Sequence, residues 1–112
     1  MINGGHIILY SKDADADKEF IKNVLKFKYV DVHAGWLIFK LPPAEIAVHP
    51  SDENDRHEFF LMTDDLDLEM TSLKKAGTAC EAVTQQNWGR VTRIKLPGGG
   101  TLGLYQPRHA RP

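Results

Sequence analysis

The sequence predicts an α+β domain in which two tandem β-α-β-β-β modules form one concave mixed sheet. The first observation is a repeat: each half opens with a histidine that is followed, at the same spacing, by an aspartate. Later segments of the two halves also match, with only small insertions between them. The matched pairs are 6–13 with 57–64, 40–42 with 95–97, and 45–49 with 101–105. Such modules pack against each other, and the concavity between them is the natural ligand site.

Length and composition place both modules in a single domain. The chain has 112 residues, and 14 basic against 15 acidic residues give a formal charge of −1. This balance does not indicate a nucleic-acid or membrane partner. Cys80 is the one cysteine, which suits a reducing compartment. Residues 1–5 lack the basic start and apolar run of a signal peptide. We therefore expect one cytoplasmic domain over residues 1–112.

The first module spans about residues 6–50. Its opening segment is rich in β-branched and aromatic residues, which is typical of a strand. A helix follows, with Asp13 at its start and an apolar stripe at helical spacing that includes Phe20 and Val24. Turn-forming dipeptides then separate three short strands. The expected elements are a strand at 6–11, a helix at 13–26, and strands near 29–33, 36–41 and 45–49.

The second module spans about residues 57–107, after a polar joint at 51–55. Asp64 and Asp65 predict the start of its helix, and Gly77 predicts the end. A proline and three glycines at 97–100 predict a tight turn between the last two strands. The expected strands are 57–63, 79–81, 89–96 and 101–106.

Alternation along the strands divides the side chains between two faces of the sheet. The more uniformly apolar face, which includes Phe60, Met62, Leu102 and Leu104, is expected to pack on the helices. The face with histidines, aromatics and small residues is expected to line the ligand cavity. Its members are His6, Ile8, Tyr10, Ala47, His49, His57, Phe59, Leu61, Gly103 and Tyr105.

Four further residues have two interpretations each. Arg90 and Arg93 lie on opposite faces of one strand, so at most one faces the cavity, where it would favour a carboxylate or phosphate on the ligand. Glu45 is either an exposed residue beside a turn or, in an apolar cup, a catalytic general base. Trp88 is either a packing residue or an overhang at the cavity mouth.

The repeat and its motifs resemble the vicinal oxygen chelate superfamily, which includes glyoxalase I, the bleomycin-resistance proteins and the extradiol dioxygenases. The resemblance is carried by the histidine that opens each module, by Asp13, Phe20 and Val24-Leu25 in the first helix, and by the closing segment 96–107. It covers nearly the whole chain. It implies the glyoxalase/bleomycin-resistance-like fold and a homodimer. It does not select among the chemistries that this fold supports.

The resemblance also implies where a divalent metal would bind. His6 and His57 match the histidines of the opening strands, but the carboxylates expected in the closing strands are replaced by Ala47 and Gly103. Two neutral imidazoles make a poor site for zinc, nickel, manganese or iron, because these ions need three or four donors. His49 or Glu45 would have to substitute.

Three functions follow from this pattern. The first is a protein that binds a small, flat, partly apolar molecule in a cavity whose metal site has eroded. The alternative is a metal-dependent lyase, isomerase or dioxygenase acting on neighbouring substrate oxygens, with His6, His57 and a substitute donor. The third is a regulatory module that uses an exposed sheet edge. The sequence leaves open whether the cavity closes within one chain or across two.

Overall fold

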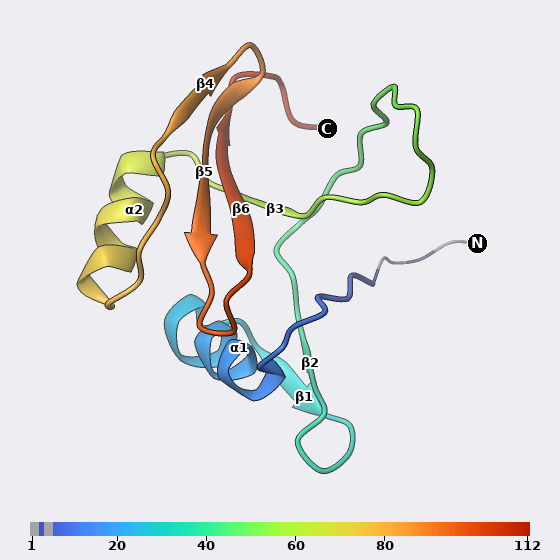
Figure 1. Cartoon of the computed structure of the whole chain (residues 1–112), viewed down its shortest axis with the longest axis vertical. Helices are drawn as coiled ribbons and strands as arrows, with labels where there is room; N and C mark the ends of the chain where they lie inside the picture. Colours follow the sequence, from blue (N-terminus) through green and yellow to red (C-terminus); the bar gives the residue numbers. More distant parts are fainter. Residues whose placement is uncertain (1–2, 4–5) are drawn as a thin grey trace.

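A computed structural model describes residue 3 and residues 6–112 and confirms the α+β class (Figure 1). Two sheets form, one of two strands and one of four. The elements in chain order are α1 (Ala14–Phe20), the π-helical turn η1 (Ile21–Leu25), β1 (Tyr29–Asp31), β2 (Leu37–Phe39), β3 (Phe60–Met62), α2 (Leu66–Lys75), β4 (Thr84–Gln86), β5 (Gly89–Lys95) and β6 (Thr101–Pro107).

The second half of the chain forms the four-stranded sheet, in the order β3-β6-β5-β4. β6 runs parallel to β3 and antiparallel to β5, and the tight turn predicted at 97–100 joins β5 to β6. The side chain of Asp65 accepts a hydrogen bond from the Leu68 amide and so caps α2. Helix α2 packs its apolar stripe on one face of the sheet, where Leu66 and Ile94 are fully buried.

The first half forms a helix and a hairpin. The side chain of Asp13 caps α1 by accepting from the Ala16 amide, as its position predicts. The helix continues through η1 and ends at Lys26, which has left-handed backbone angles. Strands β1 and β2 then pair antiparallel, from Tyr29 opposite Phe39 to Asp31 opposite Leu37.

Two predicted strands of the first half do not form. Segments 6–11 and 45–49 belong to neither sheet, and their apolar side chains remain exposed. Ile46 is 93% exposed and Val48 is 95% exposed. The physical reason is that a strand needs a hydrogen-bonding neighbour, and neither segment has one among the described residues. The prediction of one concave sheet shared by both modules is therefore wrong for the single chain.

One strand of the second half was also misplaced. A strand was expected at 79–81, but Cys80 makes only an isolated bridge with Ile94, and the edge strand β4 runs later, opposite the start of β5. The sequence of β4, Thr-Gln-Gln, is polar and exposed and gives no apolar alternation to detect.

A buried carboxylate joins the two halves. Asp17, on α1, is 7% exposed and accepts a hydrogen bond of 2.8 Å from the Gly98 amide in the turn between β5 and β6. A Cβ at Gly98 would lie 2.8 Å from the other Asp17 oxygen, so this close approach requires glycine. Phe20, one turn further along, enters the main core. Helix α1 therefore packs below the four-stranded sheet (Figure 1).

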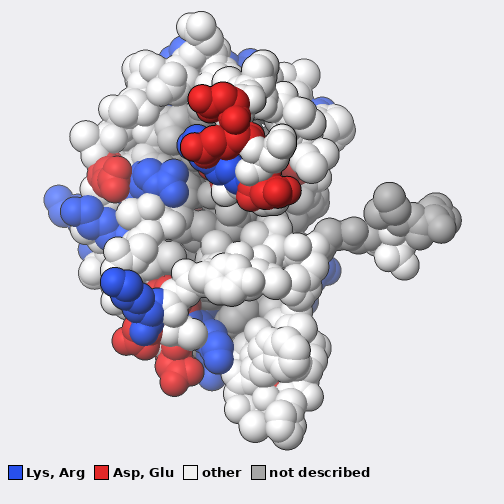
Figure 2. Space-filling model, turned by 45° about the vertical axis from the view of Figure 1, so that its right-hand side comes forward, with Lys and Arg blue, Asp and Glu red and all other residues white. Residues whose placement is uncertain are grey.

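The molecule is open for its length. The Cα radius of gyration is 14.9 Å, against about 13 Å for a compact domain of this size. On the face shown in Figure 2, acidic and basic side chains lie next to one another in small groups, with uncharged surface between them. In the described part of the chain, no helix is both long enough and apolar enough to span a membrane.

Candidate functional site

The candidate site lies on the face of the four-stranded sheet opposite α2. On β5, Ile94 packs in the core under α2 and Thr92 lies on the same side of the strand. Val91, which is itself buried, and Arg93 therefore point to the opposite face of the sheet. The register places Arg93 beside Gly103 and Val91 beside Tyr105 on β6. Residues from adjacent strands thus form a continuous surface, which we call the open face.

Three aromatic rings pack edge to face on this surface. The ring centroids lie 5.6 Å apart for Phe60 and Tyr105, 5.2 Å apart for Trp88 and Tyr105, and 6.1 Å apart for Phe60 and Trp88. The interplanar angles are 87°, 82° and 76° in the same order. Such pairs are stabilised by the quadrupoles of the rings in addition to their buried area. The cluster is therefore a rigid apolar wall.

The Phe60 ring covers Gly103. A Cβ built on Gly103 would lie 2.7 Å from Cε1 of this ring, closer than real Cβ atoms approach another atom, and 3.0 Å from Cγ. Gly103 is the position at which the resemblance implies a metal-binding carboxylate. Gly103 has no side chain, and the Phe60 ring occupies the space that a side chain would take.

A hollow of about 240 Å³ lies beside the aromatic wall. Ligand pockets for larger molecules usually measure about 300–1,000 Å³, so this hollow suits a small molecule or forms part of a larger cavity. Its lining combines apolar, amide, hydroxyl and charged groups: Phe60, Glu81, Ala82, Thr84, Gln86, Trp88, Val91, Thr92 and Arg93.

The C-terminal residues cross over the Tyr105 end of the open face. The Tyr105 hydroxyl lies 3.2 Å from Nε2 of His109, and Nδ1 of His109 lies 2.9 Å from the Ala110 carbonyl. A carbonyl can only accept, so the neutral ring donates from Nδ1 and accepts the phenol hydrogen at Nε2. Burial raises the pKa of Tyr105, the Glu45 carboxylate acts in the same direction, and Arg111 partly opposes them.

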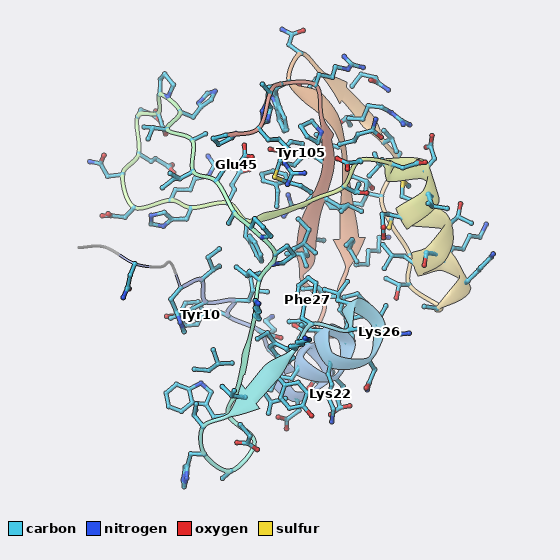
Figure 3. All side chains as sticks on the ribbon, turned by 180° about the vertical axis from the view of Figure 1, so that it is seen from behind. Tyr10, Lys22, Lys26, Phe27, Glu45 and Tyr105 are labelled. Carbon is cyan, nitrogen blue, oxygen red and sulfur yellow. The ribbon has the colours of Figure 1, made fainter. Side chains whose placement is uncertain are left out.

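Glu45 belongs to the same polar group. Figure 3 shows it beside Tyr105, whereas Tyr10 lies apart from both. An oxygen of Glu45 lies 3.7 Å from Nε2 of His109, and the other lies 3.9 Å from Nε of Arg111. Glu45 is thus surrounded by cationic or polar groups of the tail and not by the apolar cup that a general base would require.

The predicted cavity residues fall into three groups. Gly103 and Tyr105 lie on the open face, as predicted. Phe59 and Leu61 pack against the buried core, so the alternation expected for this strand is wrong by one residue. The remaining six are exposed and do not line the hollow: His6, Ile8, Tyr10, Ala47, His49 and His57.

Sequence reasoning missed the part played by Phe60 and did not choose between the two arginines. The side chains on both faces of β3 are apolar: Phe59 and Leu61 on one face, Phe60 and Met62 on the other. Hydrophobic periodicity therefore cannot tell which of the two pairs packs on the core. The sequence does not distinguish the two arginines, whereas the structure does, because both terminal nitrogens of Arg90 bind the Asp67 carboxylate on the α2 side.

The donors for the implied metal do not come together in the described part of this chain. No group of three or more histidine, cysteine, aspartate or glutamate side chains there is close enough to hold an ion. His6, His49 and His57 are exposed, and Nδ1 of His49 lies 2.8 Å from the carbonyl of the next residue. With Gly103 covered by a phenyl ring, the residues present do not fit the metal site that the resemblance implies.

Solved structures identify the fold. An antibiotic-binding protein from Streptomyces sp. CB03234, TnmS3, is 23% identical with a TM-score of 0.66, over 96% of this chain and 99% of that one. A lactoylglutathione lyase from Agrobacterium tumefaciens is 19% identical with a TM-score of 0.63, over 88% of each chain. This is a glyoxalase/bleomycin-resistance-like fold.

A third structure agrees with this assignment. A glyoxylase/bleomycin resistance protein/dioxygenase domain from Frankia sp. EAN1pec is 17% identical with a TM-score of 0.63, over 99% of this chain and 96% of that one. No protein-family model matches the chain, and no curated protein matches it either. The glyoxalase/bleomycin-resistance-like fold that the resemblance implies is confirmed, and these similarities extend to the fold alone.

Proposed function

We propose that this protein is a cytoplasmic binding protein that holds a small, flat, partly apolar molecule against the open face. The observation that carries the proposal is the Phe60 ring packed over Gly103. At the position where the resemblance implies a metal-binding carboxylate, the site presents an aromatic ring. An aromatic surface favours contact with a planar apolar group over chelation of an ion. Trp88 extends the same surface to the edge of the hollow.

One similar structure supports a binding function on this fold, since it is described as an antibiotic-binding protein. A lactoylglutathione lyase has a similar fold, so the fold alone does not indicate a binding function. In this chain the hollow is lined by aromatic rings, aliphatic and uncharged hydrogen-bonding groups, one arginine and one glutamate, which suits a partly apolar molecule. The metal-dependent alternative would need donors that the described residues do not assemble.

We further propose that two copies pair and complete the cavity between them. Segments 6–11 and 45–49 expose apolar side chains and have main-chain groups outside either sheet. Such segments pair readily with another strand. In a dimer, the predicted cavity face of these segments, His6, Ile8, Tyr10, Ala47 and His49, would lie across from the aromatic wall of the other copy, with His57 at the rim.

Binding is tested by titrating ¹⁵N-labelled protein with 2-naphthamide, a neutral planar probe. We expect the largest chemical-shift changes at the Trp88 indole N–H and at the Val91 and Gly103 amides. Trp88→Ala should weaken binding roughly tenfold because it removes a central aromatic contact. Trp36→Ala is the matched control: Trp36 is an exposed tryptophan near the β1–β2 hairpin, and its loss should leave the affinity unchanged.

Elemental analysis of the purified protein tests the alternative. The proposal predicts no stoichiometric zinc, nickel, manganese or iron, and no change in melting temperature when these ions are added. One firmly held ion per chain that disappears in His6→Ala would contradict the binding-protein proposal and restore the metal-dependent one.

A further inference from the structure

Arg93 differs from the other four arginines of the chain in how its terminal nitrogens are used. Both terminal nitrogens of Arg90 bind the Asp67 carboxylate. Those of Arg108 bind the Gln86 carbonyl and the Gln85 side chain. Arg56 pairs with a glutamate, and Arg111 lies near Glu45 and Asp64. An arginine guanidinium carries five N–H donors, and acceptors on neighbouring groups normally pair with its terminal nitrogens in this way.

Arg93 uses one donor only among the described residues. Its Nε donates to the Thr101 hydroxyl over 2.8 Å, and neither terminal nitrogen has a hydrogen-bond or ion-pair partner there. The guanidinium carbon lies 5.9 Å from the centroid of the Phe60 ring. The bond to Thr101 and the position over the ring hold the guanidinium beside Phe60, and its two terminal nitrogens stay unpaired among the described residues.

The free fork belongs to the hollow. Arg93 is half-buried and lines the hollow with Phe60 and Trp88. Glu81 also lines it, but this residue is exposed and its carboxylate lies more than 4 Å from the guanidinium, since the two form no ion pair. A charge in contact with solvent is screened, whereas a half-buried cation on an aromatic face attracts an anion more strongly.

We propose that the ligand of this site is a planar aromatic carboxylate, or a similar flat anion, whose charged group binds the free end of the Arg93 fork while its ring packs against Phe60 and Trp88. This inference rests on the proposed binding function and adds the charge and orientation of the ligand. Two parallel N–H···O bonds to a carboxylate match the geometry of the free fork. Thr84 and Gln86 are placed on the same lining to contact polar substituents.

The test compares 2-naphthoate with the neutral 2-naphthamide, which has nearly the same shape, by ¹⁵N-detected titration. The Arg93 Nε–H and the Trp88 indole N–H report the two ends of the ligand. In the unmodified protein, naphthoate should bind about tenfold more tightly than naphthamide, as expected for a charge-assisted contact at a half-exposed arginine. Arg93→Met should abolish this preference, and Arg93→Lys should keep part of it because the charge remains without the fork.

Arg90→Met is the matched control, since Arg90 lies on the same strand and points to the opposite face. It should retain the preference for naphthoate. Glu81→Gln should strengthen naphthoate binding up to a few-fold, because it removes a like charge from the rim. Circular dichroism confirms that each variant folds.

Three results would overturn the inference. Equal affinity for both probes in the unmodified protein would remove the anionic requirement while leaving the proposed binding function intact. A preference that survives Arg93→Met would place the anion elsewhere. Absence of any binding of either probe at Trp88 would overturn this inference and the proposed function together.

Discussion

The two halves of the chain carry matching sequences and reach different structures. In the second half, β6 lies at the centre of its sheet between β3 and β5, and Leu102 and Leu104 are 2% and 4% exposed. In the first half, the aligned residues Ile46 and Val48 lie in a segment outside both sheets and are 93% and 95% exposed. Sequences with the same alternation thus form a core strand in one half and an exposed segment in the other.

Alternation of apolar residues along the chain therefore specifies a strand only where a neighbouring strand can pair with it. β6 is held by seven register pairs with β5, from Gly89 opposite Pro107 to Lys95 opposite Thr101. Segment 45–49 has no such neighbour among the described residues, although Ile46 and Val48 are as apolar as the matched Leu102 and Leu104 of the core strand. Exposed apolar surface of this kind marks an interaction site, which is the basis for the proposed pairing of two copies.

The largest effect should come from truncating Leu104, and its matched residue Val48 provides the comparison. Leu104→Ala should lower the free energy of unfolding by about 2–5 kcal/mol, because it leaves a cavity in the core. Val48→Ala should have no effect in dilute protein and should lower stability as the concentration rises, if pairing buries Val48. Urea denaturation at two protein concentrations measures both. A concentration-independent loss for Val48→Ala would mean that the single chain buries this segment.

The next effect concerns Gly103 and its counterpart Ala47. Gly103→Ala should destabilise the protein by about 1–3 kcal/mol, because the new methyl group meets the Phe60 ring. The penalty should shrink in a Phe60→Ala background, which a double-mutant cycle detects. Ala47→Val is the control and should cost little, since Ala47 is exposed. Equal penalties for Gly103→Ala with and without Phe60 would show that the ring does not cover Gly103.

An effect of similar size should follow when the hydrogen bond between Asp17 and the Gly98 amide, which links the two halves, is removed. Asp17→Ala removes the acceptor of the Gly98 amide and should cost about 1–3 kcal/mol, because a buried donor loses its partner. Asp17→Asn should cost less, since its amide oxygen can still accept. Hydrogen exchange at the Gly98 amide provides the local readout and should accelerate more in Asp17→Ala. Unchanged exchange there would contradict the contact.

The smallest effect should appear in the titration of the tyrosines. Because burial raises the pKa of Tyr105 in the folded state, folding favours the protonated phenol. The stabilisation is fully present below about pH 10, the unfolded value, and is lost as the pH rises through the folded value. Absorbance at alkaline pH should show Tyr105 ionising above the usual phenol value of about 10. Subtraction of a Tyr105→Phe titration isolates the signal.

The fold class could be predicted from the sequence, but of the predicted cavity residues only Gly103 and Tyr105 lie on the open face. The helix caps at Asp13 and Asp65 and the turn at 97–100 are local features, so they could be predicted from residue type and position. Strand pairing depends on residues far apart in the sequence, and for this reason the predicted strands at 6–11 and 45–49 were wrong. The position of Gly103 on the open face could be predicted because its neighbours Leu102 and Leu104 are clearly apolar.

The aromatic wall could not be predicted, for a specific reason. Both faces of β3 are apolar, so the choice between Phe59 and Phe60 depends on the register with β6. That register places Phe60 opposite Gly103, and the missing Cβ of Gly103 leaves room for the ring. Neither fact can be read from one strand alone.

The most direct test of the account is the nuclear Overhauser effect between the Phe60 ring and Gly103. We predict strong cross-peaks from the Phe60 ring protons to the Gly103 α-protons, together with cross-peaks to Trp88 and Tyr105. Cross-peaks from Phe60 to Leu66 and Leu73 instead would place the ring in the core under α2. That result would remove the aromatic wall and contradict the proposed binding site.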